Sequence, residues 1–132
     1  ISQYLGRDGK CMFLIEPDFW QYYGDASQEG GANSGEYMRA LYDDICKVVR
    51  DKLPNAIFSW DISAWLKPEA MQKWWSYFQT SPYISYIHTS GGQSRPDLAN
   101  IKPNELTWKY MNELTGKKII ADCGKYINIK FE

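Results

Sequence analysis

Four apolar runs of this chain each end in an ionisable residue. The runs CMFLIE, AIFSWD, YISYIH and KKIIAD close with Glu16, Asp61, His88 and Asp122. In a parallel sheet the carboxyl ends of the strands meet at one edge, which is where α/β folds place their active sites. We therefore expect these four side chains to lie together at one rim. The alternative is that each residue only caps its own strand.

A group of carboxylates at one rim suits the hydrolysis of glycosidic bonds. That reaction needs one carboxyl group kept protonated as the acid and a second carboxylate as base or nucleophile. Crowding and partial burial push the pKa values of neighbouring carboxyl groups apart, which separates the two roles. We predict that Asp122, Asp61 and Glu16 are catalytic, and that Asp18 and His88 bind the substrate.

Aromatic residues are unusually frequent, at 16% of the chain with six Trp and ten Tyr. Such rings either fill a Trp-rich core or stack on flat apolar faces such as those of sugars. Trp20, Tyr22 and Trp65 lie near the ends of the apolar runs, and we expect them to contact substrate. Trp60 directly precedes Asp61, so strand alternation turns the two side chains to opposite faces and favours a core position for Trp60.

Apolar runs and helical patterns alternate along the chain. Helices are expected at residues 36–53, 68–79 and 103–114, and strands at residues 11–16, 56–61, 83–88 and 117–122, with an alternating tail at 126–132. This alternation indicates an α/β fold with a parallel sheet. We expect residues 1–132 to form a single α/β domain that resembles half of a (β/α) barrel, because a complete barrel needs about 250 residues.

The first predicted helix has a clear apolar periodicity. Six residues recur at intervals of three and four and are predicted to face the core: Met38, Leu41, Tyr42, Ile45, Val48 and Val49. Ser34 is suited to cap the start of this helix, and Gly116 is suited to end the third helix. Asp43 and Asp44 are expected on the solvent side.

Three segments resemble the second half of the catalytic domain of glycoside hydrolase family 6, a family of cellulases. They are FLIEPDFWQ, LPNAIFSWDISAWL and KKIIADCG, and their order and spacing agree over most of residues 11–124. The resemblance implies a distorted parallel α/β barrel and inverting hydrolysis of β-1,4-linked glucan. It implies that Glu16 and Asp18 shape the sugar cleft, that Asp61 holds a sugar hydroxyl or organises the site, and that Asp122 matches the family's proposed base.

The family's proton donor is an Asp on an earlier strand, which precedes the part of the barrel that this sequence resembles. We therefore expect a glycoside hydrolase-like domain that hydrolyses glucan if the donor is supplied, through self-association or a complementary barrel half. The alternative is a non-catalytic carbohydrate-binding domain, or a structural or interaction domain, derived from such a barrel.

Charge and composition exclude several other classes. A net charge of −1 gives no basic surface for nucleic acid, and no apolar run approaches the roughly 20 residues of a membrane span. No cofactor and no metal site is expected, although His88 with Asp61 or Asp122 is a minor metal alternative to a structural histidine. Cys11, Cys46 and Cys123 are expected to be buried thiols, with one disulfide as the alternative. We expect the protein to be extracellular, although no signal peptide is visible.

Overall fold

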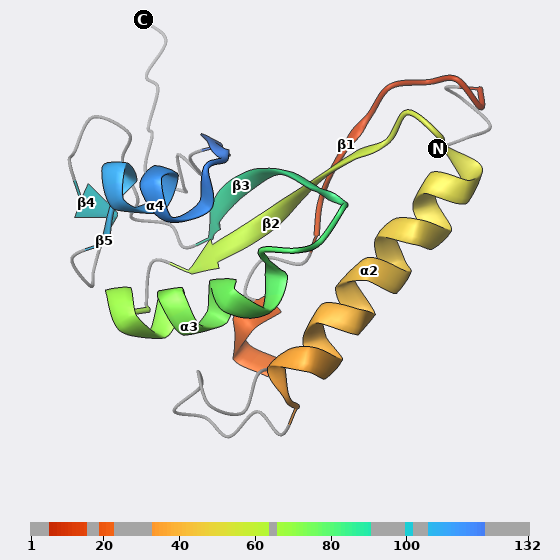
Figure 1. Cartoon of the computed structure of the whole chain (residues 1–132). Helices are drawn as coiled ribbons and strands as arrows, with labels where there is room; N and C mark the ends of the chain where they lie inside the picture. The colour runs from red at the N-terminus through yellow and green to blue at the C-terminus, as the bar shows by residue number, and fades with distance from the viewer. Residues whose placement is uncertain are drawn as a thin grey trace, which may run out of the picture.

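The chain forms a parallel sheet with helices between its strands (Figure 1). The computed structural model describes residues 6–15, 19–22, 33–63, 66–90, 100–101 and 106–120, without the side chains of 21, 22, 89, 90, 100 and 101. The strands are β1 (Met12–Leu14), β2 (Ile57–Ser63), β3 (Ile84–Ser90), β4 (Asn100–Ile101), β5 (Leu106–Thr107) and β6 (Lys118–Ile120). The helices are η1 (Phe19–Tyr22), α2 (Gly35–Lys52), α3 (Pro68–Phe78) and α4 (Trp108–Thr115).

The main sheet has the order β1-β2-β3-β6, and all its neighbouring strands are parallel. The predicted α/β fold with a parallel sheet is therefore confirmed. Each strand pairs with the next sheet strand in the chain, and crossovers between parallel strands are right-handed. Because each new strand is added at the same edge of the sheet, the right-handed connections place their helices on the same side. Figure 1 shows α2 and α3 together on one side of the sheet.

An aromatic core fills the space between the sheet and its helices. Trp60 on β2 stacks on Trp74 of α3 at 6.0 Å between ring centroids, and Phe78 lies 5.2 Å from the same indole. Trp60, Trp74 and Phe78 are fully buried, so the core position expected for Trp60 is confirmed. Much of the aromatic content therefore serves packing, because each such ring removes a large apolar area from water.

Helix α2 begins and ends close to its predicted limits. Ser34 caps it by accepting a hydrogen bond from the backbone N–H of Tyr37 at 3.2 Å, as expected. Met38, Tyr42 and Cys46 are buried in the hydrophobic core. The prediction of an inward position was wrong for three other residues, which are exposed: Leu41, Ile45 and Val48. The apolar residues of α2 extend further around the helix axis than the side that is buried in the core. Some of them therefore lie on a side of the helix that the rest of the fold does not cover.

Helices α2 and α3 are joined by a charged cluster at one end. Arg39 donates to Asp43 at 2.6 Å, to the carbonyl oxygen of Tyr77 at 3.0 Å and to Thr80 at 2.9 Å. Ser81 donates to the second oxygen of Asp43 at 2.6 Å. Asp43 is therefore only partly exposed, and its predicted place on a solvated face was wrong because the segment after α3 approaches it.

Close approach of the two helices also explains Gly35. A Cβ atom built on Gly35 would collide with the aromatic ring of Tyr77 in α3. The absence of a side chain at this position lets the start of α2 lie against α3, so the glycine is required by packing rather than by backbone conformation.

Helix α4 starts later than its sequence pattern suggested. Residues 106–107 form β5, which pairs with β4 in an antiparallel ribbon, so the predicted helix start at residue 103 was wrong. Thr107 caps α4 by accepting from the backbone N–H of Tyr110 at 3.0 Å. The helix ends at Gly116, whose φ of 64° is the left-handed conformation that glycine adopts without strain, as expected.

Candidate functional site

Asp61 and His88 lie side by side on neighbouring strands. The register of β2 and β3 pairs Asp61 with His88. Both strands run two residues further than expected, to Ser63 and Ser90, so Asp61 and His88 lie within the strands and not at their ends. Alternation places Trp60 on the side of α2 and α3, so Asp61 and His88 occupy the opposite face. This face carries no helix among the described residues, and we call it the helix-free face.

Three polar side chains meet on this helix-free face. His88 Nδ1 lies 2.9 Å from Ser59 Oγ, and His88 Nε2 lies 3.7 Å from Asp61 Oδ1. Ser59, Asp61 and His88 are all buried. Ser63, two residues beyond Asp61, is also buried. We call Ser59, Asp61 and His88 the buried polar cluster.

Within the buried polar cluster, Ser59 and His88 Nδ1 are at hydrogen-bond distance, whereas Asp61 and His88 Nε2 are farther apart. If the neutral imidazole carries its proton on Nε2, Nδ1 accepts from the Ser59 hydroxyl. A protonated imidazole would instead donate at both nitrogens. Burial of a carboxylate is costly unless a nearby positive group or hydrogen bond compensates, so the position of His88 beside Asp61 is energetically important.

Ser59 and Ser63 were not predicted as site residues. The signal was present, because both lie two residues from Asp61 on a strand and therefore share its face. A single serine within an apolar run is common in buried strands and does not by itself indicate a functional site. Only the pairing of β2 with β3 brings the Ser59 hydroxyl to His88.

The other predicted site residues fall into two groups. Four lie outside the described residues: Glu16, Asp18, Trp65 and Asp122. Trp20 is in η1, where it is partly buried and packs against the core. Tyr22 ends η1, and its side chain is outside the description. The structure thus brings Asp61 and His88 together and leaves the expected four-residue rim untested.

Cys46 on α2 is a buried thiol, as expected, and Cys11 is a partly buried free thiol. Burial raises the pKa of Cys46 to about 12 and also raises the pKa of the neighbouring Tyr42 phenol. Both groups therefore remain protonated at neutral pH. Cys123 lies outside the described residues.

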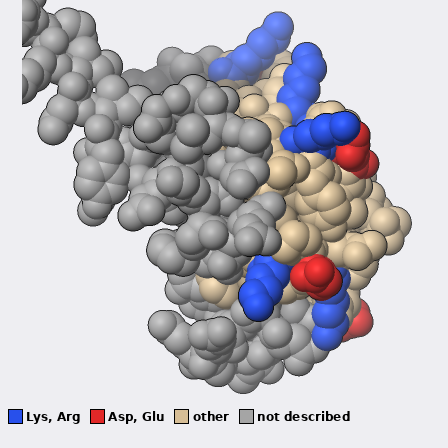
Figure 2. All heavy atoms as spheres, turned by 90° about the vertical axis from the view of Figure 1, so that its left-hand side faces the viewer, with Lys and Arg blue, Asp and Glu red and all other residues tan. Residues whose placement is uncertain are grey.

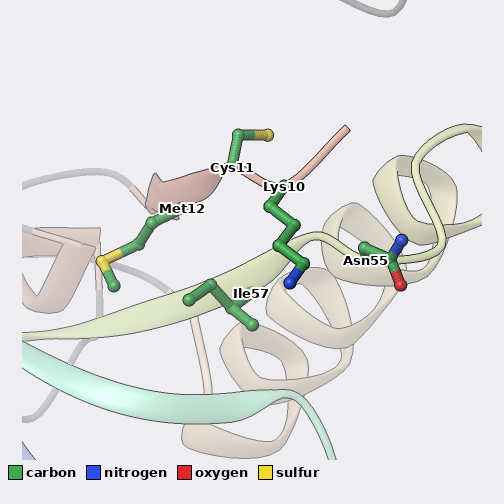
Figure 3. A pocket seen from close by; sticks show the side chains of 5 residues that line it. All are labelled: Lys10, Cys11, Met12, Asn55 and Ile57. Atoms are coloured by element: carbon green, nitrogen blue, oxygen red, sulfur yellow. The ribbon is translucent and has the colours of Figure 1, made fainter. Parts of the chain in front are cut away.

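A pocket lies on the helix-free face at the amino-terminal ends of β1 and β2 (Figure 3). Its volume is about 400 Å³, and it is lined by Lys10, Cys11, Met12, Asn55 and Ile57. Ile57 is four residues before Asp61 on β2, which corresponds to about 13 Å along a strand. In Figure 3 the Lys10 side chain extends toward β2 while the Cys11 side chain points the other way. The pocket is therefore separate from the buried polar cluster.

Figure 2 shows Lys and Arg side chains beside Asp and Glu side chains on the described part of this surface, with uncharged residues between them. Within the described ranges, no helix has the length and apolar character to cross a bilayer. The same residues contain no group of three or more His, Cys, Asp or Glu side chains able to hold a metal ion.

No protein-family model, curated protein or solved structure matches this chain.

Proposed function

We propose that this protein is a carbohydrate-active α/β domain that binds β-1,4-linked glucan over the helix-free face of its sheet and hydrolyses it there. The observation that carries the proposal is the position of Asp61 beside His88 on that face. Asp61 would orient a sugar hydroxyl, and His88 would hold its carboxylate in place. Asp122 would act as the base, with Glu16 and Asp18 at the same end of the cleft.

The topology supports a cleft on this side of the sheet. In a (β/α) barrel the strands follow one another in chain order, the helices lie outside, and the active site forms at the carboxyl ends of the strands, above a packed interior. The order β1-β2-β3-β6 follows that arrangement for four strands. We therefore propose that the sheet is part of a barrel and that the face with the buried polar cluster is its interior.

A non-catalytic role is the second candidate. Four of the described aromatic residues favour it, because Trp60, Trp74 and Phe78 are fully buried and Trp20 packs against the core. None of these four rings is an open platform on which a sugar could stack. An interaction domain that retains the architecture of a glycosidase would show this pattern, with the buried polar cluster serving stability.

Binding and turnover separate the two candidates. The parent chain is mixed with insoluble cellulose and with soluble β-glucan, and bound protein and released reducing ends are measured. We expect binding to both polymers, and turnover wherever a general acid is available. Asp122→Asn should then lower turnover by at least about a hundredfold, the lower end of what a general base supplies. Asp61→Asn should also lower turnover, because the sugar hydroxyl would lose its partner.

Asp44→Asn is the matched control, because Asp44 is an exposed carboxylate on α2. Circular dichroism of each variant must match the parent before rates are compared. Glucan binding without release of reducing ends would favour the non-catalytic carbohydrate-binding domain. Absence of any binding to either polymer would overturn the proposal as a whole.

A further inference from the structure

The pocket at the amino-terminal ends of β1 and β2 takes its lining from two neighbouring runs of the chain (Figure 3). The strand register pairs Met12 with Ile57, so these two side chains point to the same side of the sheet. Lys10 precedes Met12 by two residues, Asn55 precedes Ile57 by two, and both line the same pocket. We call this hollow the strand-start pocket.

The strand-start pocket has a polar end and an apolar end. Lys10 and Asn55 lie at the outer end, where the chain enters the two strands. Met12 and Ile57 belong to the strands and are half-buried. Cys11 also lines the pocket, but its side chain points the other way in Figure 3 and packs against the hydrophobic core. A ligand in this pocket would therefore meet a cation and an amide at one end and two apolar side chains at the other.

Hydrogen bonds hold the walls of the strand-start pocket in place. The backbone N–H of Ile57 donates to the carbonyl oxygen of Cys11 at 3.0 Å. The Asn55 amide donates to the carbonyl oxygen of Asp8 at 3.1 Å, which ties the segment before β1 to the turn before β2. Walls that the fold already fixes lower the cost of binding, because a ligand does not have to order them.

The charge of Lys10 is not used within the described part of the fold. Its side chain is exposed and forms no ion pair with another residue of the described ranges. A Lys ammonium group is a compact point charge with three donors, which suits a single carboxylate. The outer end of the pocket is therefore complementary to a ligand that carries one negative charge.

We propose that the strand-start pocket binds a small amphipathic carboxylate, such as a medium-chain fatty acid. The carboxylate lies at Lys10, and the hydrocarbon chain lies over Met12 and Ile57. The unbranched Met12 side chain adapts to the shape of such a chain. The volume of about 400 Å³ is near the lower end of the range for ligand pockets, which favours a small molecule.

Other ligand classes fit the strand-start pocket less well. A phosphate group is typically held by several N–H donors at the amino end of a helix. The helix that precedes Asn55 is α2, which reaches this region with its carboxyl end, where the dipole is negative. A sugar ring stacks on an aromatic face, and none of the five lining residues is aromatic. The pocket is thus not an extension of the proposed glucan cleft and does not depend on glucan binding.

Titration of the parent chain with sodium octanoate, followed by amide shifts in NMR spectra, tests the proposal. We expect saturable shifts in residues 10–12 and 55–57, with a dissociation constant of about 1 mM or below, because a ligand of this size makes few contacts. Butyrate should bind at least about tenfold more weakly, since each buried CH₂ group changes affinity by about fourfold. Octanamide keeps the hydrocarbon chain but lacks the charge, and it should also bind more weakly than octanoate.

Lys10→Glu tests the position of the carboxylate. It should weaken octanoate binding at least about tenfold and remove the preference for octanoate over octanamide, because a like charge now faces the ligand. Lys47→Glu is the matched control, since it makes the same change at an exposed residue of α2 and should alter neither quantity. Circular dichroism checks that both variants are folded.

Three results would overturn the proposal. They are the absence of saturable shifts in residues 10–12 and 55–57, equal affinities of the parent chain for octanoate and octanamide, and equal effects of the Lys10→Glu and Lys47→Glu changes. Because no glucan is present in these titrations, their outcome is independent of the test of glucan hydrolysis.

Discussion

At the scale of single residues, the feature that most needs an explanation is a buried carboxylate beside the only histidine of the chain. Replacement of a buried ion pair by apolar residues of similar volume is often neutral or stabilising, so packing alone does not require Asp61 and His88. Ser59 Oγ fixes the imidazole from one side at 2.9 Å, and Asp61 lies 3.7 Å from its other nitrogen. The Ser59 contact therefore orients the imidazole so that its second nitrogen lies on the side of Asp61.

We expect Ser59→Ala to destabilise the fold. The change removes a buried partner of His88 Nδ1, and loss of one partner of a buried hydrogen bond costs about 1–3 kcal/mol. Urea denaturation at neutral pH measures the difference in the free energy of unfolding. Ser76→Ala is the control, because Ser76 Oγ donates to a carbonyl oxygen on the exposed side of α3. Equal stability of the two variants would show that the Ser59–His88 contact contributes nothing.

Cys46 makes the stability of the fold sensitive to alkaline pH. The pKa of its thiol is raised from 9.0 to about 12 by burial, so above about pH 9 the unfolded chain loses this proton while the folded chain keeps it. The free energy of unfolding should therefore fall as pH rises from about 9 toward 12, by up to about 1.4 kcal/mol per pH unit for this group. Tyr42 acts in the same direction at higher pH.

The contribution of Cys46 is isolated by comparing the parent with Cys46→Ala. The variant should be less stable at pH 7, because a buried side chain is shortened. Its stability should, however, decline less steeply between about pH 9 and pH 10 than that of the parent. Parallel declines in the two proteins would mean that the thiol ionises equally well in the folded and unfolded states.

At the scale of secondary structure, α2 shows that one helix can have three different sides. One side of α2 is buried in the core, and one flank binds α3 through Arg39 and Asp43. The other flank carries exposed apolar side chains such as Leu41 and Val48. A helix held from two directions has a defined rotation about its axis. That rotation is what keeps Leu41 and Val48 at the surface, although their periodicity is that of core residues.

We expect Asp43→Ala to weaken the attachment of α2 to α3. Asp43 accepts hydrogen bonds from Arg39 and Ser81, and its loss should lower the free energy of unfolding by about 1.5–3 kcal/mol, the range for bonds to a charged group. Asp44→Ala makes the same change on the solvated side and should shift stability by less than about 0.5 kcal/mol. Thermal unfolding of both variants gives the comparison, and equal losses would contradict this role of Asp43.

The limits of sequence reasoning are visible in these same elements. Local chemistry predicted the Ser34 cap and the Gly116 end, because a cap depends on residues three or four positions away. Alternation predicted that Trp60 and Asp61 face opposite sides. The sides of Asp43 and Leu41 were predicted wrongly, since they depend on how far α3 and the sheet extend around α2. The contact of Ser59 with His88 depends on strand register, which no local pattern contains.

At the scale of the whole molecule, the sheet order explains why the two faces differ. Every step from β1 to β6 moves in one direction, so the helices accumulate on one side and the aromatic core forms there. The helix-free side receives the alternate residues of β2 and β3, where Ser59, Asp61 and His88 are found. The sheet therefore has an apolar face toward the helices and a polar face opposite them. The strand order determines where the helices lie, and the alternation of side chains along each strand determines which residues face them.

The sheet order also predicts how the protein opens. β2 and β3 are the central strands, each paired on both sides, whereas β1 and β6 are short and each pairs on one side within the described residues. Amides that are buried and paired on both sides exchange with solvent only through large-scale unfolding, while edge strands also exchange through local opening. We therefore expect the slowest hydrogen exchange in residues 58–63 and 86–88, with faster exchange in residues 12–14 and 118–120.

Exchange measured by NMR or mass spectrometry at neutral pH, with urea added below the unfolding transition, checks this order. As urea increases, exchange of the central strands should follow the global free energy of unfolding, and exchange of β1 and β6 should depend less on urea because local opening exposes less surface. Slower exchange in β1 or β6 than in β2 would show that an edge of the sheet is covered in solution.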